Sequence, residues 1–233
     1  MLASVDSTNA EGFRRALHLS GPLWILAEVQ TAGRGRRARP WVSPPGNFHA
    51  TLVQRLPGAP AEAALRSYVA ALALFDTVEA LTGAGAALAL KWPNDLLLNG
   101  GKVSGILLEA TGDLLCIGIG VNLIAAPPPE AVEPGAVPPV SVLAETGVRL
   151  TPPAFLDALA AAMAGREAQF RSGGFPALRA DWLARAARLG QTIRARTGAE
   201  TREGVFETVD DSGNLILRTA AGRVVLPAAD VFF

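Results

Sequence analysis

The amino-acid sequence predicts an α+β protein: a mixed, mostly antiparallel sheet flanked by helices, followed by a small C-terminal β-barrel. Strand-like runs alternate with helical stretches through most of the chain. One pair of runs is joined by Asn99-Gly100-Gly101, and Asn-Gly supplies the positive φ angles of a tight hairpin turn. From Gly190 onward the pattern changes to short alternating strands, which are typical of a small barrel.

The elements follow from hydrophobic periodicity and turn residues. Helices are predicted over 9–19, 61–81, 152–171 and 175–188. The first has Ser7 or Thr8 as its cap, with Phe13, Ala16 and Leu17 on one face. The strands of the main sheet are predicted at 24–29, 48–54, 87–91, 95–98, 102–110 and 113–121.

The last two segments complete this organisation. Residues 125–139 are rich in proline and are predicted to form a surface strap. The tail contains strand-like segments at 191–196, 203–209, 214–219 and 223–226, with a turn at 211–213. We therefore expect a catalytic domain over 1–188 and a small β-barrel domain over 189–233.

Charge and cysteine content exclude several classes of protein. The chain has 21 Lys and Arg against 21 Asp and Glu, so no global field attracts it to nucleic acid or anionic lipid. Its single cysteine, Cys116, rules out a disulfide framework within the chain and a multi-cysteine zinc site. The apolar run around Cys116 predicts a buried thiol.

The sequence has neither a signal-peptide pattern nor an apolar span long enough to cross a membrane. We therefore expect a cytoplasmic protein with no membrane partner.

The densest chemistry lies in residues 30–41, which we call the arginine loop. It reads Gln-Thr-Ala-Gly-Arg-Gly-Arg-Arg-Ala-Arg-Pro-Trp. Gly33 and Gly35 allow close approach of the backbone to a ligand, and guanidinium groups match phosphate or carboxylate geometry. The loop is neither a phosphate-binding Walker loop nor a dinucleotide fingerprint, because the required Lys-Ser/Thr ending and third glycine are missing. A solvated basic loop or a nucleic-acid contact is the alternative interpretation.

A second cluster lies on the predicted hairpin between Lys91 and Glu109. The turn at 99–101 brings Lys102 near Asp95 across the ladder. A buried charge must be paired or face a ligand, so an ammonium group here suits a carboxylate or phosphate. An exposed turn lysine and a capping carboxylate are the plainer alternatives.

The third cluster is Gly118-Ile119-Gly120-Val121-Asn122, at the end of a predicted strand. Glycines inside an apolar strand indicate close approach of a ligand or a neighbouring strand. Asn122 offers an amide donor and acceptor to a ligand, or else caps a loop.

Together these clusters resemble the biotin protein ligase family, and they occur in the family's order and spacing over essentially the whole chain. The matching segments are Asp6-Ser7-Thr8-Asn9, the arginine loop, Ser43-Pro44-Pro45-Gly46-Asn47, Lys91-Trp92-Pro93-Asn94-Asp95 with Lys102, Gly105 and Glu109, and Gly118 to Asn122. The resemblance implies the biotin–lipoate ligase fold, similar to class II synthetases, with a C-terminal barrel of the Src-homology-3 type.

The resemblance also implies a two-step reaction. ATP, with Mg²⁺, activates biotin to biotinyl-5'-AMP, and the biotin then passes to a lysine of the biotin carboxyl carrier protein of acetyl-CoA carboxylase or a related carboxylase. Residues for biotin would be Ser7, Thr8, Asn9, Gln30, Gly33, Arg34, Gly35, Arg36 and Lys102. Residues for ATP and its adenine would be Arg34, Arg36, Trp41, Asn94, Lys102 and Asn122. Lys102, Arg36 and Asp95 would be catalytic, with no dedicated protein metal site.

Two departures from the family pattern stand out. Ala38 replaces a usual glycine, and His49 stands where the family has an aromatic residue. His49 either faces the biotin pocket or is a structural histidine. The rival functions are a lipoate–protein ligase, whose pattern lacks the arginine loop, and a non-enzymatic nucleic-acid binder. Because the first motif lies at residues 6–9, we expect no N-terminal DNA-binding domain and no nucleic-acid partner; homodimer formation stays open.

Overall fold

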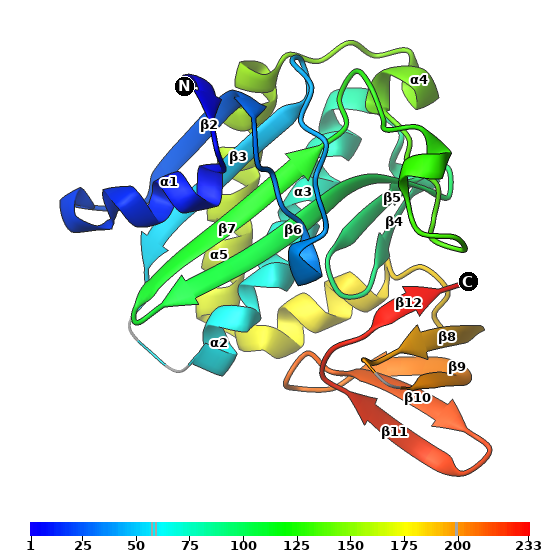
Figure 1. Ribbon diagram of the computed structural model, residues 1–233. Coiled ribbons are helices and arrows are strands. Elements are labelled where there is room, and N and C mark those ends of the chain that lie inside the picture. The colour runs from blue at the N-terminus through cyan, green and yellow to red at the C-terminus, as the bar shows by residue number, and fades with distance from the viewer. Residues whose placement is uncertain (57, 59, 199) are drawn as a thin grey trace.

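A seven-stranded sheet forms the centre of the larger part of the molecule (Figure 1). The computed structural model describes residues 1–56, 58, 60–198 and 200–233. The strand order is β1-β2-β3-β7-β6-β5-β4. The first pair is parallel and every other pair is antiparallel, which confirms the mixed, mostly antiparallel sheet. The strands are β1 (Leu2–Val5), β2 (Leu23–Gln30), β3 (Phe48–Arg55), β4 (Leu88–Lys91), β5 (Asp95–Leu98), β6 (Gly101–Thr111) and β7 (Leu114–Val121).

Helices cover both faces of this sheet because its strands alternate apolar residues to either side. Phe48, Ala50 and Leu52 of β3 belong to the main core, which also contains α3 (Arg66–Thr82) and α5 (Pro152–Leu183). Val53 points to the opposite face and joins Cys116 in a smaller cluster. The helix α1 (Thr8–Arg15) packs over that smaller cluster and continues as a 3₁₀ turn, Ala16–His18.

Several predicted elements differ in detail. The helix expected over 61–81 is divided into α2 (Pro60–Ala64) and α3, and the short helix α4 (Val142–Thr146) was not predicted. The two helices expected over 152–171 and 175–188 form one element, α5, interrupted by Gly174 with φ 65°. It ends at Leu183, because the chain beyond it bridges to β4: Leu90 N donates to Arg185 O at 2.8 Å. Leu17, expected on the buried face of α1, is 90 % exposed.

The C-terminal segment forms a separate antiparallel sheet of five strands. Its order is β11-β10-β9-β8-β12, so β12, which sequence patterns did not reveal, lies beside β8. Within the part of the chain that the structure describes, no pairing of β11 with β12 closes this sheet into a barrel. The strands are β8 (Thr192–Arg196), β9 (Thr201–Val209), β10 (Leu215–Thr219), β11 (Gly222–Leu226) and β12 (Asp230–Phe232).

The two sheets are joined by one continuous hydrophobic core and by a hydrogen-bonded contact. Tyr68 of α3 donates its hydroxyl to the carbonyl of Gly213 at 2.7 Å. The indole of Trp92 donates to the same carbonyl at 3.1 Å and to the Tyr68 hydroxyl at 3.0 Å. The turn before β10 is thereby attached to the segment between β4 and β5. None of the described helices combines the length and the apolar character needed to cross a membrane.

Asn47, the last residue of the Ser43 to Asn47 motif, has a structural role. Its side chain is buried, and its Oδ1 accepts hydrogen bonds from Ile124 N at 2.9 Å and Ala125 N at 3.1 Å. Its Nδ2 donates to Ala125 O at 2.7 Å. Asn47 therefore attaches the start of β3 to the chain that leaves β7 and enters the strap (125–139).

We expect Asn47→Ala to lower the free energy of unfolding by about 3 kcal/mol, because it removes three hydrogen bonds to the backbone of residues 124 and 125. Urea denaturation followed by circular dichroism measures this change. Ser172→Ala, which removes one hydroxyl from an exposed site, is the control and should change stability by less than about 0.5 kcal/mol. Equal stability of Asn47→Ala and the wild type would contradict the bracing role.

Candidate active site

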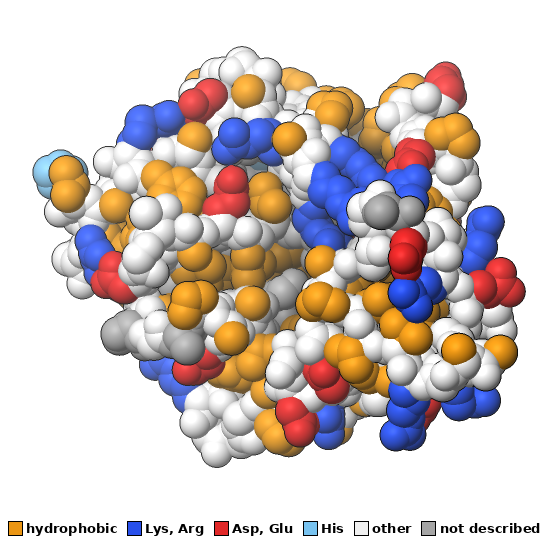
Figure 2. Space-filling model, turned by 60° about the horizontal axis from the view of Figure 1, so that its bottom comes forward, with side chains coloured by type: hydrophobic (Ala, Val, Ile, Leu, Met, Phe, Trp, Pro, Cys, Tyr) orange, Lys and Arg blue, Asp and Glu red, His pale blue; other side chains and the backbone are white. Residues whose placement is uncertain are grey.

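A cavity of about 620 Å³ opens between the arginine loop, the β5–β6 hairpin, the strap and β12. Figure 2 shows Lys and Arg side chains gathered beside a hollow with hydrophobic side chains in its floor. Of the residues proposed from sequence for ligand binding or catalysis, all but Gly33 line this cavity. They are Ser7, Thr8, Asn9, Gln30, Arg34, Gly35, Arg36, Trp41, Asn94, Asp95, Lys102 and Asn122.

Gln30 organises one end of the cavity. Its Oε1 accepts from Thr8 N at 2.9 Å and from the Thr8 hydroxyl at 3.1 Å, and its Nε2 donates to Ser43 at 3.1 Å. Ser7 precedes α1 but does not use its hydroxyl to cap the helix. The hydroxyl of Ser7, at the wall of the cavity, is therefore available to a ligand, while Thr8 and Gln30 hold each other in position.

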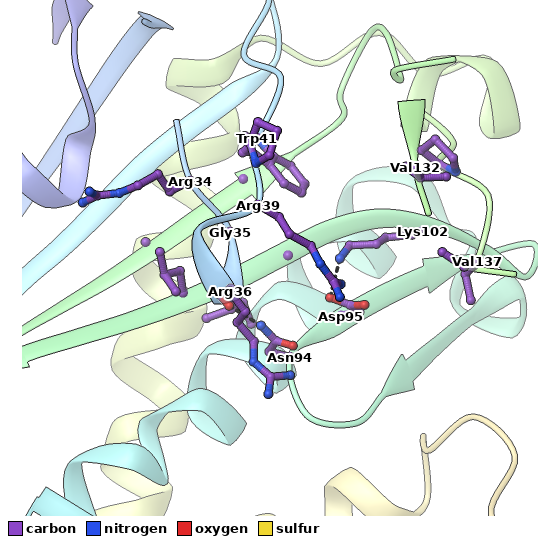
Figure 3. Close-up of a pocket in the computed structure, with 18 of the residues that line it drawn as sticks. Arg34, Gly35, Arg36, Arg39, Trp41, Asn94, Asp95, Lys102, Val132 and Val137 are labelled. Carbon is purple, nitrogen blue, oxygen red and sulfur yellow. Dashed lines mark hydrogen bonds and ion pairs between the residues drawn. The ribbon is translucent and has the colours of Figure 1, made fainter. Parts of the chain in front are cut away.

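Asn9 and Arg34 belong to the same end. Asn9 Nδ2 donates to Glu109 Oε2 at 2.8 Å, and the guanidinium of Arg34 lies 3.7 Å from Glu109 Oε1. A Cβ atom at Gly118 would lie 2.5 Å from Asn9 Oδ1, so β7 needs glycine there to admit Asn9. In Figure 3 the side chain of Arg34 points away from Lys102 and Asp95, which separates the two ends of the cavity.

The arginine loop folds back on itself. Gly35 N donates to Arg39 O at 2.8 Å, and Trp41 N donates to Gly33 O at 2.9 Å. Arg37 and Ala38 both adopt left-handed backbone conformations, with φ 56° and 57°. The usual glycine at position 38 fits this conformation without the steric cost that Ala38 bears. Gly33 serves the turn, because a Cβ there would lie 2.7 Å from Trp41 O.

Trp41 lies on a flat floor made by two cross-strand glycines. Gly105 of β6 pairs with Gly120 of β7, and Gly105 also pairs with Asp95 of β5. A Cβ at Gly120 would lie 2.4 Å from Cε2 of the Trp41 indole, and one at Gly105 would lie 3.3 Å from Cζ3. The close approach predicted from glycines in this strand is therefore made by the side chains of Asn9 and Trp41.

Asp95 is held between two ammonium groups at the other end of the cavity, and Figure 3 shows one of them, that of Lys102, beside it. Lys102 Nζ lies 2.7 Å from Asp95 Oδ1, and Lys91 Nζ lies 3.6 Å from Oδ2. A bulge in the β5–β6 pairing between Leu96 and Leu97 accompanies this placement. Burial alone would raise the pKa of Asp95, but the two ammonium groups outweigh it and hold the pKa below the usual 3.8. Burial lowers the pKa of Lys91.

The two asparagines use their amides to fix backbone at the cavity wall. Asn94 donates from Nδ2 to Ile106 O, and Ile106 N donates back to Asn94 O at 3.1 Å. Asn122 donates from Nδ2 to Val140 O at 3.0 Å. Donation by each Nδ2 to backbone fixes the orientation of both amides at the cavity.

Sequence reasoning missed the contributions of the strap and of β12. The strap and the residue that follows it fix Lys102 by two backbone bonds: Lys102 N donates to Pro138 O at 2.8 Å, and Val140 N donates to Lys102 O at 3.0 Å. Glu133 of the strap and Asp230 of β12 line the cavity as well. Both carboxylates pair with Arg39, at 3.2 and 2.7 Å. No local pattern marks these residues, since each partner is far away in the chain.

The two remaining titratable residues of interest are buried outside the lining. His49 is 1 % exposed, and one ring nitrogen lies 3.3 Å from Pro44 O. Burial lowers its pKa, so the ring is neutral at physiological pH. Cys116 is fully buried in the cluster beneath α1, as its apolar run predicted, and burial raises its pKa to about 12. Neither placement suggests a role in chemistry.

The charges around the cavity favour an anionic ligand. Five cations line it, Arg34, Arg36, Arg39, Lys91 and Lys102, against the three carboxylates of Asp95, Glu133 and Asp230. Arg36 has no carboxylate partner among the described residues and donates only to Ala229 O, at 3.4 Å. Burial lowers its pKa. Among the described residues, no cluster of three or more His, Cys, Asp or Glu side chains could hold a metal ion.

A cavity with a polar end and a cationic end suits a ligand that carries a neutral polar head and an anionic tail. Residues 1–123 match the model of the Biotin/lipoate A/B protein ligase family, and residues 189–233 match the Biotin protein ligase C terminal domain. The fold and this match define the class: protein ligases of the biotin and lipoate type.

Individual relatives narrow the class. The Biotin--[acetyl-CoA-carboxylase] ligase of Paracoccus denitrificans is 58 % identical, covering 100 % of this chain and 99 % of its own. The Biotin--[acetyl-CoA-carboxylase] ligase of Mycobacterium tuberculosis is 34 % identical, and the match covers 99 % of this chain and 87 % of that protein. Among solved structures, the biotin protein ligase of Aquifex aeolicus in complex with biotin and ATP has a TM-score of 0.86 at 23 % identity, over 99 % of this chain and 95 % of its own. The chain belongs to the biotin protein ligase family.

The Asp95 cluster gives a pH-dependent prediction. Because the folded-state pKa lies below 3.8, Asp95 stabilises the folded protein above that pH, and the contribution is lost as the pH falls through the folded-state pKa. We expect Asp95→Asn to lower the free energy of unfolding by on the order of 3 kcal/mol at pH 7, since it leaves two ammonium groups near each other without a carboxylate.

Urea denaturation of both proteins at several pH values measures this effect, and the difference should shrink below pH 3.8. Asp113→Asn is the matched control. It removes the carboxylate of an exposed pair with Arg55, at 2.7 Å, and should cost less than about 1 kcal/mol. A difference for Asp95→Asn that persists undiminished at pH 3 would be evidence against the ion-pair account.

Proposed function

We propose that this protein is a biotin ligase that uses the described cavity for both of its reactions. It activates biotin with ATP to biotinyl-5'-AMP and transfers the biotin to a lysine of a carboxylase carrier. The observation that carries this assignment is the division of one cavity into a polar end around Gln30 and a cationic end around Lys102. Biotin has the same division, with a ureido ring at one end and a carboxylate at the other.

We assign the ureido ring to the end of the cavity lined by Ser7, Thr8, Asn9, Gln30 and Arg34. Donors and acceptors are both present there, as the ureido group requires. The free hydroxyl of Ser7 and the fixed amide of Gln30 support this direction of binding. The carboxylate of biotin then extends along the cavity toward Lys102.

Adenylation requires one oxygen of the biotin carboxylate to attack the α-phosphorus of ATP while the bond to pyrophosphate breaks. We assign Lys102 to the carboxylate and the α-phosphate, and Arg36 to the phosphate oxygens where charge accumulates. Arg36 supports this role because it is desolvated and has no carboxylate partner among the described residues. Adenine is assigned to Trp41, Asn94 and Asn122, where an aromatic face and two oriented amides meet the cavity.

ATP enters this reaction as its magnesium complex, and the metal shields charge on the polyphosphate. The residues at the cavity support binding through substrate oxygens and water. Asp95 is already engaged by two lysines, and the carboxylates of Glu133 and Asp230 are paired with arginines.

Transfer requires the amine of a carrier lysine to attack the carbonyl carbon of the mixed anhydride, so that the bond to AMP breaks. Asp95 lies at the cationic end and can receive the incoming ammonium group. Its lowered pKa makes it a weak base, so of the two roles considered for it, orientation of the amine is favoured over proton removal. The arginine loop excludes water, which protects the anhydride from hydrolysis.

We propose the carrier to be the biotin carboxyl carrier protein of acetyl-CoA carboxylase, and the cytoplasm to be the compartment. The name of the 58 % identical relative supports the carboxylase. The lone buried thiol is compatible with a reducing compartment. We further propose that residues 1–188 carry both substrate sites and that residues 189–233 act as a domain that completes the cavity, because Asp230 and Phe232 line it.

The test of this function is exchange of labelled pyrophosphate into ATP. We expect exchange that depends on biotin and is not supported by lipoate, followed by labelling of a carrier domain when one is added. Lipoate serves as the matched competitor because the two acids share the adenylation chemistry. Exchange with lipoate and none with biotin would refute the assignment.

Lys102 should matter more for the first half-reaction than for the second. We expect Lys102→Ala to reduce adenylation by about 10²–10³-fold, because a single preorganised charge at the reacting phosphate contributes on that scale. Transfer from supplied biotinyl-5'-AMP should fall far less. Single-turnover assays of each half-reaction measure the two effects, and equal losses in both would mean that Lys102 only supports the fold.

A further inference from the structure

Asp230 connects the C-terminal sheet to the arginine loop. Its Oδ2 lies 2.6 Å from Arg37 Nη1 and 2.7 Å from Arg39 Nη2, across more than half of the chain. Its side chain is only 12 % exposed, and Arg196 of β8 adds a third guanidinium at 3.2 Å. The preceding residue accepts the bond from Arg36 through Ala229 O. Residues 229 and 230 thus contact three of the four arginines in the loop.

The loop contains strained backbone whose energetic cost its contacts must offset. Arg37 and Ala38 carry side chains in left-handed conformations, which cost energy relative to extended or right-handed backbone. Within the loop, the bonds from Gly35 N to Arg39 O and from Arg39 N to Arg36 O oppose this cost. The left-handed turn places the guanidinium of Arg37 on Asp230, so this ion pair helps to offset the cost of the strained backbone.

The carboxylate is ionised at physiological pH. Burial alone would raise the pKa of Asp230, but the guanidinium groups of Arg39 and Arg196 outweigh it and hold the pKa below its usual value. Glu133 of the strap shares two of these partners, at 3.2 Å from Arg39 and 2.5 Å from Arg196. Glu133 does not contact Arg37, so Asp230 is the carboxylate that reaches the strained residue.

We propose that Asp230 is a positioning residue whose carboxylate holds the arginine loop closed over the cavity through Arg37 and Arg39. Loop closure then depends on the C-terminal sheet, and the residence time of an acyl-adenylate depends on Asp230, although this residue performs no chemistry. The effect of Asp230 on loop closure does not require a ligand. Its effect on the residence time of the acyl-adenylate rests on the proposed function.

Limited trypsin digestion of the ligand-free, full-length protein tests the effect on the loop. Cleavage after Arg34, Arg36 and Arg37, identified by mass spectrometry, reports how often the loop opens. We expect Asp230→Asn to be cleaved there about tenfold faster than the wild type, because it keeps the shape of the side chain but removes its charge. Asp230→Glu should restore part of the protection, and Asp113→Asn, the matched surface control, should leave the rate unchanged.

Arg37→Gln removes the same ion pair from the loop side and leaves the C-terminal sheet intact. We expect faster cleavage after Arg34 and Arg36 in this variant. Adding Asp230→Asn to it should accelerate cleavage less than Asp230→Asn does in the wild type, because only the pair with Arg39 is left to lose. Equal cleavage of wild type and Asp230→Asn would overturn the proposal. So would independent, multiplying effects of the two substitutions, since they would show that the residues do not act through each other.

A pulse–chase measurement of bound biotinyl-5'-AMP tests the second consequence. We expect about tenfold faster release from Asp230→Asn, with rates for Glu133→Gln between that variant and the wild type. If Asp230→Asn accelerates proteolysis of the loop but not release of the adenylate, the claim that Asp230 sets the residence time of the adenylate is wrong. Failure of the wild type to form any adenylate would instead refute the proposed function and leave the result on the loop intact.

Discussion

The buried carboxylate of Asp95 is the constraint around which the cavity is arranged. A charge at that depth must be compensated, and the compensation comes from two lysines on different strands. The bulge between β5 and β6 and the two backbone bonds that residues 138 and 140 make with Lys102 both place an ammonium group beside it. The same cross-strand row continues through Gly105 to Gly120, where the absence of side chains admits Trp41. One row of the sheet therefore sets both the electrostatics of the cavity and its shape.

The cavity is assembled from segments that are distant in the chain. The main sheet supplies the floor, while the arginine loop, the strap and β12 form the walls. Carboxylates of the last two segments neutralise arginines of the first, so each wall holds another in place. The contact of Gly213 with Tyr68 and Trp92 also fixes the small sheet. The small sheet is thus attached to the larger part of the molecule by these polar contacts in addition to the shared hydrophobic core.

Local signals predicted much of this arrangement. The Asn-Gly turn was sufficient to place Lys102 near Asp95, because both residues belong to one hairpin. The glycines of β7 indicated close approach, although the approaching groups are side chains of the protein. Asp230 and Glu133 escaped prediction because their partners are remote in sequence and nothing in β12 or the strap marks them locally. The bridge from Ala186 to β4, which ends α5 early, is long-range for the same reason.

Gly12 of α1 lies directly on the thiol of Cys116: a Cβ at position 12 would lie 2.8 Å from Sγ. The helix that begins at Thr8 therefore acts as the cover of the only cysteine in the chain. A reagent that alkylates thiols reaches Cys116 only when α1 lifts from the sheet or the whole domain unfolds. Since Thr8 and Asn9 at the start of α1 line the cavity, the molecule carries an intrinsic chemical reporter of motion at the polar end of its own binding site.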